Sequence, residues 1–282
     1  MNAKTFNWTT PDGILIQGYH WDSFHAKAVV VWVHGLGEYA GRYADYAKYL
    51  STYGIASVGY DRRGHGRSGG KRGHTPSYEA LQEEIMYLLA HTRELYPTVP
   101  IFLYGHSMGG NLVLYNALNY RPDVTGVIAG SPWIELTERP PFFKVLAGRI
   151  ASKIAPAFTL PNGLDPRFLS RDSKAVEAYL EDPLVHDQIS ASAGTAMIDT
   201  GRWLANYKKE SKIPILLMHG SEDRLTSPEA SQAFAGQVKG DITFVSWDGA
   251  YHELHHEPNK AEIMEVARKW MEEHLDTEIK NA

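Results

Sequence analysis

The sequence predicts an α/β protein built on a mostly parallel central sheet with an antiparallel edge. Short apolar runs rich in Val and Ile alternate with amphipathic helical stretches, which is typical of strands covered by helices on both faces. Two strand-like stretches flank Pro11-Asp12-Gly13 near the start, which predicts a hairpin. The alternation stops between residues 131 and 212, where helical patterns dominate. This interruption predicts an inserted helical unit.

The elements follow in a regular order. The hairpin joins residues 6–10 and 14–21, because Pro presets the turn and Gly accepts a positive φ. Buried strands are expected at residues 28–33, 55–60, 101–104, 124–129, 215–218 and 242–247. Helices are expected at residues 78–96, 111–119 and 260–275. Residues 1–130 and 213–282 therefore form the expected core.

The insertion at residues 131–212 is expected to be a helical cap over the ligand-binding edge of the sheet, without strands. Within it, apolar residues share one helical face, namely Phe143, Leu146, Ile150 and Ile154. Basic residues flank that face: Lys144, Arg149 and Lys153. We expect the apolar face to pack on the protein body. A partner interface or a transient contact with a membrane surface is the alternative.

Composition excludes several classes of protein. The 282 residues, 43% hydrophobic and 22% charged, have an ordinary globular composition and are not a disordered chain. The absence of cysteine excludes disulfides and thiolate metal sites, and fits a reducing compartment. The first residues lack the apolar core of a secretory signal, so we expect a cytoplasmic protein. A net charge of −5 gives no indication of nucleic-acid binding.

One serine lies between an expected strand and an expected helix. The stretch reads Gly105-His106-Ser107-Met108-Gly109-Gly110. This Gly-x-Ser-x-Gly pattern predicts a tight strand-to-helix turn that exposes the Ser107 hydroxyl at the carboxyl edge of the sheet. The glycines leave room where side chains would collide with neighbouring backbone. Ser107 is therefore the predicted nucleophile.

A serine hydroxyl needs a base, and in this architecture the chain order is Ser, acid, His. Asp223 follows the strand expected at residues 215–218, and His252 follows the strand expected at 242–247. Parallel neighbouring strands would bring both loops to the edge that carries Ser107. His252 would accept the Ser107 proton while Asp223 fixes the imidazole tautomer. Glu222 is the rival acid.

Acyl transfer also needs backbone donors for the developing oxyanion. The Met108 amide would lie at a helix N-terminus, where the helix dipole favours an anion. The second donor is expected in the Gly-rich stretch His34-Gly35-Leu36-Gly37, which follows an early strand. We assign it to the Leu36 amide.

These residues, with further stretches, resemble the monoacylglycerol lipase branch of the α/β-hydrolases, a group that includes lysophospholipases. The resemblance covers nearly the whole chain. Its marks are Gly35-Leu36-Gly37-Glu38, Asp61-Arg62-Arg63-Gly64-His65-Gly66, the serine motif, Gly220-Ser221-Glu222-Asp223 and Gly249-Ala250-Tyr251-His252. The resemblance implies the α/β-hydrolase fold, the same catalytic residues and the same oxyanion donors.

The resemblance also implies a lipid ester substrate and no cofactor or metal. In that family a polar site near the nucleophile holds the glycerol head group, and the matching positions are Glu38, Arg42 and His255. A structural role for these residues, such as tying down a loop, is equally open. We expect the acyl chain to lie under the cap, among residues such as Phe142, Phe143, Leu146 and Trp203. Leu36 is bulkier than the family's usual small residue, which would narrow the acyl pocket.

Competing functions remain at this point. The stretch His252-Glu253-Leu254-His255-His256 satisfies His-Glu-x-x-His, but the Gly and Pro around it indicate a loop rather than the helix that zinc ligation needs. Residues 61–73 are rich in Arg and Gly, and a structural loop is favoured there over a phosphate site. A lysophospholipase, a broad carboxylesterase and a serine peptidase are alternatives, as is a non-catalytic binding protein of the same fold. No pattern sets the oligomeric state.

Overall fold

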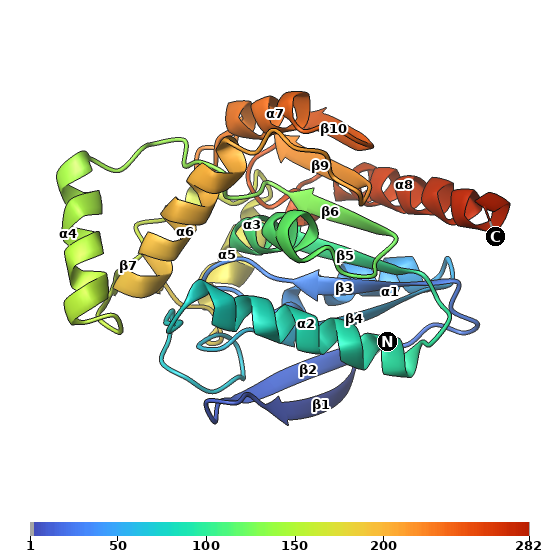
Figure 1. The fold of residues 1–282 in the computed structure, drawn as a ribbon, viewed down its shortest axis with the longest axis horizontal. Coiled ribbons are helices and arrows are strands. Elements are labelled where there is room, and N and C mark those ends of the chain that lie inside the picture. The colour runs from blue at the N-terminus through green and yellow to red at the C-terminus, as the bar shows by residue number, and fades with distance from the viewer. Residues whose placement is uncertain (1–2, 282) are drawn as a thin grey trace.

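The computed structural model describes residues 3–281, with side chains as far as residue 275. Within this part of the chain the main sheet has eight strands in the order β1-β2-β4-β3-β5-β6-β9-β10 (Figure 1). Their bounds are Lys4–Thr9, Leu15–Trp21, Ile55–Asp61, Ala28–Val33, Ile101–His106, Gly126–Gly130, Ile215–Gly220 and Ile242–Trp247 in that spatial order. The consecutive strands β4, β3, β5, β6, β9 and β10 pair in parallel, while β2 pairs antiparallel with β1 and β4. The predicted sheet with its antiparallel hairpin is confirmed.

Helices cover both faces of the sheet (Figure 1). On one face lie α2 (Tyr78–Leu95), α3 (Met108–Tyr115) and α7 (Pro228–Gln237), and on the other lie α1 (Ala44–Ser51) and α8 (Lys260–Asn281). A hydrophobic core lies on each face of the sheet. Strand β3 contributes side chains to both cores, because alternate side chains of a strand point to opposite faces. Every residue of β3 is buried, which explains its continuous run of apolar residues.

Two core helices were not predicted. Helix α1 has eight residues and buries only Tyr46, Ala47 and Leu50, so its apolar pattern is too short to stand out. Helix α7 buries only Ser231 and Phe234. The sequence feature that indicates α7 is the beginning of the helix, where Ser227 is followed by proline. The Ser227 hydroxyl accepts a hydrogen bond from the Ala230 amide.

The insertion joins β6 to β9 and lies beside the carboxyl ends of the sheet strands (Figure 1). It contains α4 (Phe142–Ile154), α5 (Ser173–Glu181) and α6 (Ala191–Ala205). The expectation that it has no strands was wrong. Strands β7 (Thr159–Pro161) and β8 (Gln188–Ser190) pair antiparallel within it. Each has only three residues, too few for an alternating pattern to be visible in the sequence.

The apolar face of α4 does not pack on the protein body, so that expectation was wrong as well. Phe143 is 67% exposed and Ile154 is 80% exposed, because the contact of α4 with α6 does not cover these two side chains. Phe142 is exposed too. Trp203 of α6 instead packs between the rings of Tyr115 and Tyr207. Within the described residues, no helix is long and apolar enough to cross a lipid bilayer.

Candidate active site

Ser107 occupies the turn between β5 and α3 in a strained backbone conformation, with φ 54° and ψ −117°. The two glycines of the motif make this turn sterically feasible. A Cβ at Gly105 would lie 2.2 Å from the Gly109 carbonyl oxygen, and a Cβ at Gly109 would lie 2.0 Å from the Val33 carbonyl oxygen. The sequence motif thus forms the predicted sharp turn, and Ser107 lines a small pocket at the sheet edge.

Asp223 lies in the loop after β9 and is buried. One of its carboxylate oxygens, Oδ1, accepts hydrogen bonds from the amides of Leu225 (2.8 Å) and Thr226 (3.1 Å). The other, Oδ2, accepts from His252 Nδ1 at 2.7 Å. Burial opposes ionisation, but the interactions with His252 and His219 outweigh it and lower the pKa of Asp223 well below its usual value. The rival acid Glu222 is exposed.

His252 lies in the loop after β10 and lines the same pocket as Ser107. Because β5, β6, β9 and β10 are consecutive neighbours in the sheet, the loops that follow three of them meet at one edge. Burial alone would lower the pKa of His252, but the Asp223 carboxylate reverses this effect and raises that pKa above the ordinary value. The Asp223–His252 bond occupies Nδ1 and leaves Nε2 for a partner in the pocket.

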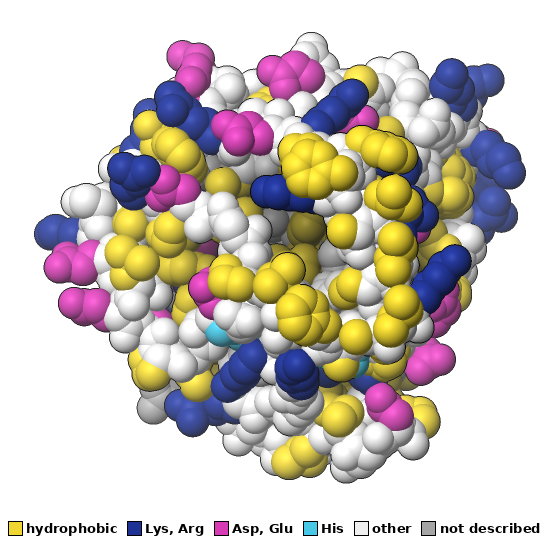
Figure 2. Space-filling view, turned by 90° about the vertical axis from the view of Figure 1, so that its left-hand side faces the viewer, with side chains coloured by type: hydrophobic (Ala, Val, Ile, Leu, Met, Phe, Trp, Pro, Cys, Tyr) yellow, Lys and Arg dark blue, Asp and Glu magenta, His cyan; other side chains and the backbone are white. Residues whose placement is uncertain are grey.

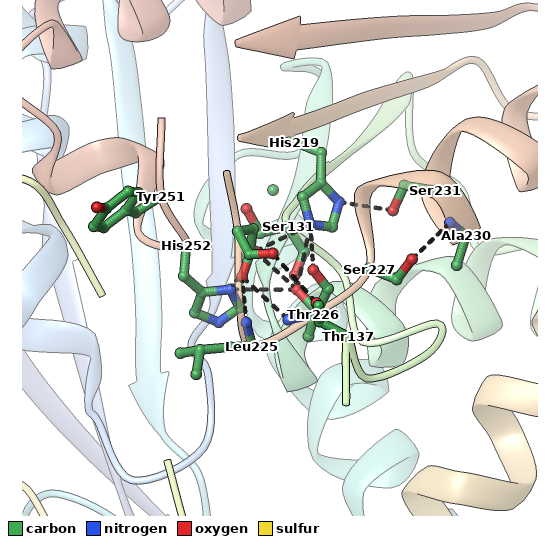
Figure 3. A network of polar contacts seen from close by, with 12 residues as sticks. Ser131, Thr137, His219, Leu225, Thr226, Ser227, Ala230, Ser231, Tyr251 and His252 are labelled. Carbon is green, nitrogen blue, oxygen red and sulfur yellow. Dashed lines mark hydrogen bonds and ion pairs between the residues drawn. The ribbon is translucent and has the colours of Figure 1, made fainter. Parts of the chain in front are cut away.

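A second buried imidazole, which the sequence analysis missed, contacts the same carboxylate. His219 Nε2 lies 3.0 Å from Asp223 Oδ2, and His219 Nδ1 lies 2.8 Å from the Ser231 hydroxyl (Figure 3). The Thr226 hydroxyl donates to Oδ2 as well, at 3.0 Å. Asp223 is therefore held by donors on several sides. The only sequence signal for His219 was its position four residues before the acid, at the end of a buried strand.

The expected oxyanion donors lie next to Ser107. Met108 is the first residue of α3, so its amide has no partner within the helix. Leu36 and Gly35 line the pocket together with Ser107. The approach is close, because a Cβ at Gly35 would lie 3.3 Å from the Ser107 Cβ.

The three residues expected to hold a head group have different surroundings. Glu38 lines the pocket and accepts hydrogen bonds from the Gly35 amide at 2.6 Å and the Tyr43 hydroxyl at 2.8 Å. Arg42 is bound by Glu38 at 2.9 Å and by both carboxylate oxygens of Glu253, at 2.5 and 2.7 Å. Arg42 also lies over the ring of Tyr179, which comes from α5 and lines the pocket. From the sequence, Glu253 stood out only as part of the zinc-like stretch, and Tyr179 carried no signal.

His255 is buried behind these groups and stacks on Tyr43, with ring centroids 4.7 Å apart. Burial lowers the pKa of His255 well below its usual value, and so do the neighbouring His256 and His106. Burial also raises the pKa of Glu38, whereas the charge and hydrogen bonds of Arg42 outweigh burial and lower the pKa of Glu253 to about 2. Arg42 thus favours the ionised form of Glu253.

The zinc-like stretch does not form the helix that such a site needs. Residues 252 and 253 lie in a loop, and only a short 3-10 helix, Leu254–His256, follows. Glu253, His255 and His256 do place ligand atoms within 4.8 Å of one another. The Glu253 carboxylate, however, is bound by Arg42 through both oxygens. This arrangement favours an ion pair at Glu253.

The Arg- and Gly-rich stretch at residues 61–73 forms a structural loop around a carboxylate. Asp61 accepts hydrogen bonds from the amides of Ala40 and Arg67, at 2.9 and 2.8 Å. Its Oδ2 atom also accepts from the Tyr19 hydroxyl at 2.9 Å. Arg63 is paired with Glu84 and Asp12. These interactions give Asp61 and Arg63 structural roles in the loop.

The insertion contains a larger cavity of about 640 Å³ between α4, α6 and the β7–β8 pair. Its apolar lining includes Val145, Phe158, Leu160, Ile189 and Ile198. Figure 2 shows a hollow on this face, surrounded by hydrophobic side chains with Lys and Arg near the margin. A smaller cavity beside it shares Val145 and Ile198 and reaches Trp133, the second residue after Ser131.

The strand order, the strained serine turn and the paired Asp223 and His252 define an α/β-hydrolase of the serine type. The model of the family described as serine aminopeptidase, S33, matches residues 25–259, and the chain belongs to this family. Its relatives place it in the monoacylglycerol lipase branch. A monoacylglycerol lipase of Mycolicibacterium smegmatis is 31% identical over 88% of this chain and 89% of its own length.

Two further similarities agree with this family. The crystal structure of Paleococcus ferrophilus monoacylglycerol lipase matches with a TM-score of 0.85 and 35% identity, over 92% of this chain and 99% of that one. An uncharacterized abhydrolase domain-containing protein of Dictyostelium discoideum is 36% identical over 88% of this chain. The match spans only 27% of that longer protein.

Proposed function

We propose that this chain hydrolyses the ester bond of monoacylglycerols through an acyl-Ser107 intermediate. The observation that carries the proposal is the hydrogen bond between His252 Nδ1 and Asp223 beside the strained turn that presents Ser107. His252 takes the Ser107 proton as the hydroxyl attacks the ester carbonyl, and then returns it to the leaving glycerol oxygen. Water attacks the acyl-enzyme in the second half-reaction, again with His252 as the base, and releases the fatty acid.

The amides of Leu36 and Met108 stabilise the oxyanion in both half-reactions. Each donor in such a hole contributes roughly 10²–10³ in kcat. Met108 supplies its amide from the N-terminus of α3, where the helix dipole favours negative charge.

The glycerol head group binds on the side of the pocket formed by Glu38 and Tyr179, with Arg42 and His255 behind them. Glu38 offers a carboxylate at the pocket wall, although three protein donors already use it. Arg42 fixes Glu38 by its ion pair, so we assign Arg42 both the loop-tying role and the orientation of the head-group site.

Residues 131–212 act as a cap over a core formed by residues 1–130 and 213–282. The acyl chain runs from Ser107 into the apolar cavity under α4 and α6. The exposed apolar side chains of α4, flanked by Lys144, Arg149 and Lys153, contact a membrane surface transiently when substrate is taken up. We propose a cytoplasmic location, on the basis of the cysteine-free composition.

A substrate panel tests this function. We expect turnover of monoacylglycerols to exceed that of lysophospholipids, diacylglycerols, short aryl esters and aminoacyl amides, all measured with the same enzyme preparation. A higher kcat/KM for lysophospholipids would assign the chain to the phospholipase alternative. That alternative is included because a phospholipase from Bacillus subtilis is 28% identical to this chain. A higher value for aminoacyl amides would assign it to peptidases.

A further inference from the structure

Arg62 is a buried charge without a carboxylate partner. Its side chain is among the largest that are fully buried, at 0% exposure, and within the described residues it forms no ion pair. The adjacent Arg63 is buried too, but it pairs with Glu84 and Asp12. A buried charge without an opposite charge beside it is unfavourable for folding, so stability does not explain the presence of Arg62.

All three side-chain contacts of Arg62 are to the segments expected to bind the oxyanion. Its Nε donates to the His34 carbonyl at 3.2 Å, and its Nη2 donates to the Gly35 carbonyl at 2.6 Å. Its Nη1 lies 3.5 Å from the sulfur of Met108. One guanidinium therefore spans the loop that contains Leu36 and the first residue of α3.

The contact with the Gly35 carbonyl fixes the direction of the Leu36 amide. In a trans peptide the C=O of one residue and the N–H of the next point in opposite directions. Since the Gly35 carbonyl points at the buried Arg62, the Leu36 N–H of the same peptide points to the other side. Gly35 and Leu36 line the pocket of Ser107, whereas Arg62 lies beneath them.

His34 reinforces this arrangement. Its Nε2 accepts a hydrogen bond from the Arg62 backbone amide at 2.9 Å, so the ring proton resides on Nδ1. That Nδ1–H donates to the Gly35 carbonyl at 2.8 Å. The preceding peptide is fixed from the other side, since the Gly35 amide donates to Glu38. Both peptide groups before Leu36 are thus held by buried partners.

We propose that Arg62 is a positioning residue for oxyanion stabilisation, which holds the Gly35–Leu36 peptide so that the Leu36 amide faces the reacting carbonyl. The inference rests on the proposed function, because it requires the Ser107 chemistry. The Arg62 charge adds to the effect, since negative charge develops in the pocket during the reaction and the guanidinium lies directly behind the donors. Arg62 acts through the backbone and does not touch the substrate.

The test compares Arg62→Met with Arg63→Met, which removes the adjacent buried arginine and loses stability for an unrelated reason. The assays are hydrolysis of p-nitrophenyl butyrate and inhibition by an alkyl trifluoromethyl ketone, whose adduct with Ser107 carries an oxyanion. We expect Arg62→Met to lower kcat by about 10- to 100-fold with KM changed less than about threefold. The inhibition constant should rise by a factor similar to the loss in kcat. Arg63→Met should leave kcat and inhibition within about threefold of wild type, whatever its melting temperature.

A folded Arg62→Met enzyme with wild-type kcat and wild-type inhibition overturns the proposal. If that variant does not fold, Arg62→Lys provides the test of the proposal. Lysine keeps the charge but lacks the planar guanidinium that reaches the carbonyls of both His34 and Gly35. A folded Arg62→Lys enzyme must then show reduced kcat and weaker inhibition, and unchanged values overturn the proposal. Failure of the proposed function is separately visible, since wild-type enzyme would then neither hydrolyse the ester nor bind the ketone.

Discussion

Asp223 Oδ2 and His252 Nδ1 lie 2.7 Å apart, although the two residues follow different strands and are 29 positions apart in the chain. The carboxylate is oriented for this contact by two backbone amides that bind its other oxygen. The His252 ring is therefore held in one orientation, with the nitrogen that faces the pocket free to exchange a proton with Ser107.

Replacing Asp223 with Asn should abolish most of the activity. In Asn the carbonyl oxygen would keep the bonds from the Leu225 and Thr226 amides, so the uncharged NH₂ group would face His252 Nδ1. That group donates to Nδ1 and favours the wrong imidazole tautomer, so we expect kcat to fall by roughly 10⁴-fold. Glu222→Gln is the matched control, because Glu222 is exposed and adjacent in sequence. Its kcat should stay within about threefold of wild type. A larger loss in Glu222→Gln than in Asp223→Asn would exchange the roles of the two acids.

The acid limb of the pH profile should report His252. Asp223 raises the pKa of His252 above the ordinary value of 6.5, and only neutral imidazole accepts the Ser107 proton. We therefore expect kcat/KM to fall as the pH drops through a midpoint above 6.5. The midpoint should move down in Asp223→Asn, where the stabilising charge is lost. A wild-type midpoint well below that of free histidine would contradict this assignment, and a kcat/KM titration between pH 5 and 9, roughly, would detect it.

Ser107 should be important for activity and unfavourable for stability. Its φ of 54° is a conformation that glycine adopts without strain and that other residues rarely adopt. We expect Ser107→Gly to unfold with a free energy about 1–2 kcal/mol higher than Ser107→Ala, measured by denaturant titration. Both variants should retain less than about 1% of wild-type turnover. Equal stabilities would show that the turn is unstrained in solution.

The candidate catalytic residues were predictable from the sequence, whereas the buried residues that hold them in place were not. Ser107, Asp223 and His252 each lie in the turn or loop that follows a strand, and parallel strands bring such positions to one edge. Arg62 and His219 also end or follow strands, but a sequence gives no reason to expect a buried polar side chain to bind a backbone carbonyl or an acid. Their roles depend on which atoms meet in space.

The orientation of α4 could not be predicted from the sequence either. Its apolar pattern predicted an amphipathic helix correctly, but the pattern does not indicate what lies against the apolar face. We expected this face to pack on the protein body because the apolar face of an amphipathic helix usually faces the core. In the structure Phe143 and Ile154 are exposed. The β7–β8 pair was missed because each strand has three residues.

The outward face of α4 should affect membrane binding but not chemistry. We expect the double variant Phe143→Ser/Ile154→Ser to bind anionic vesicles several-fold more weakly in a sedimentation assay, because apolar area and basic residues both contribute. Since both side chains are exposed, the unfolding free energy should change by less than about 0.5 kcal/mol. Phe24→Ser is the control, since Phe24 is 89% exposed outside the insertion. Equal vesicle binding by wild type and the double variant would leave this face without a membrane role.

The identity of the reacting hydroxyl is tested most directly by covalent labelling with an alkyl fluorophosphonate, followed by intact-protein and peptide mass spectrometry. We predict a single adduct on Ser107, formed in step with loss of ester hydrolysis and absent from Ser107→Ala. The labelling rate should fall steeply in His252→Ala, because the base that activates the hydroxyl is missing. Inactivation accompanied by an adduct on another residue, or full activity after complete labelling of Ser107, would contradict the account.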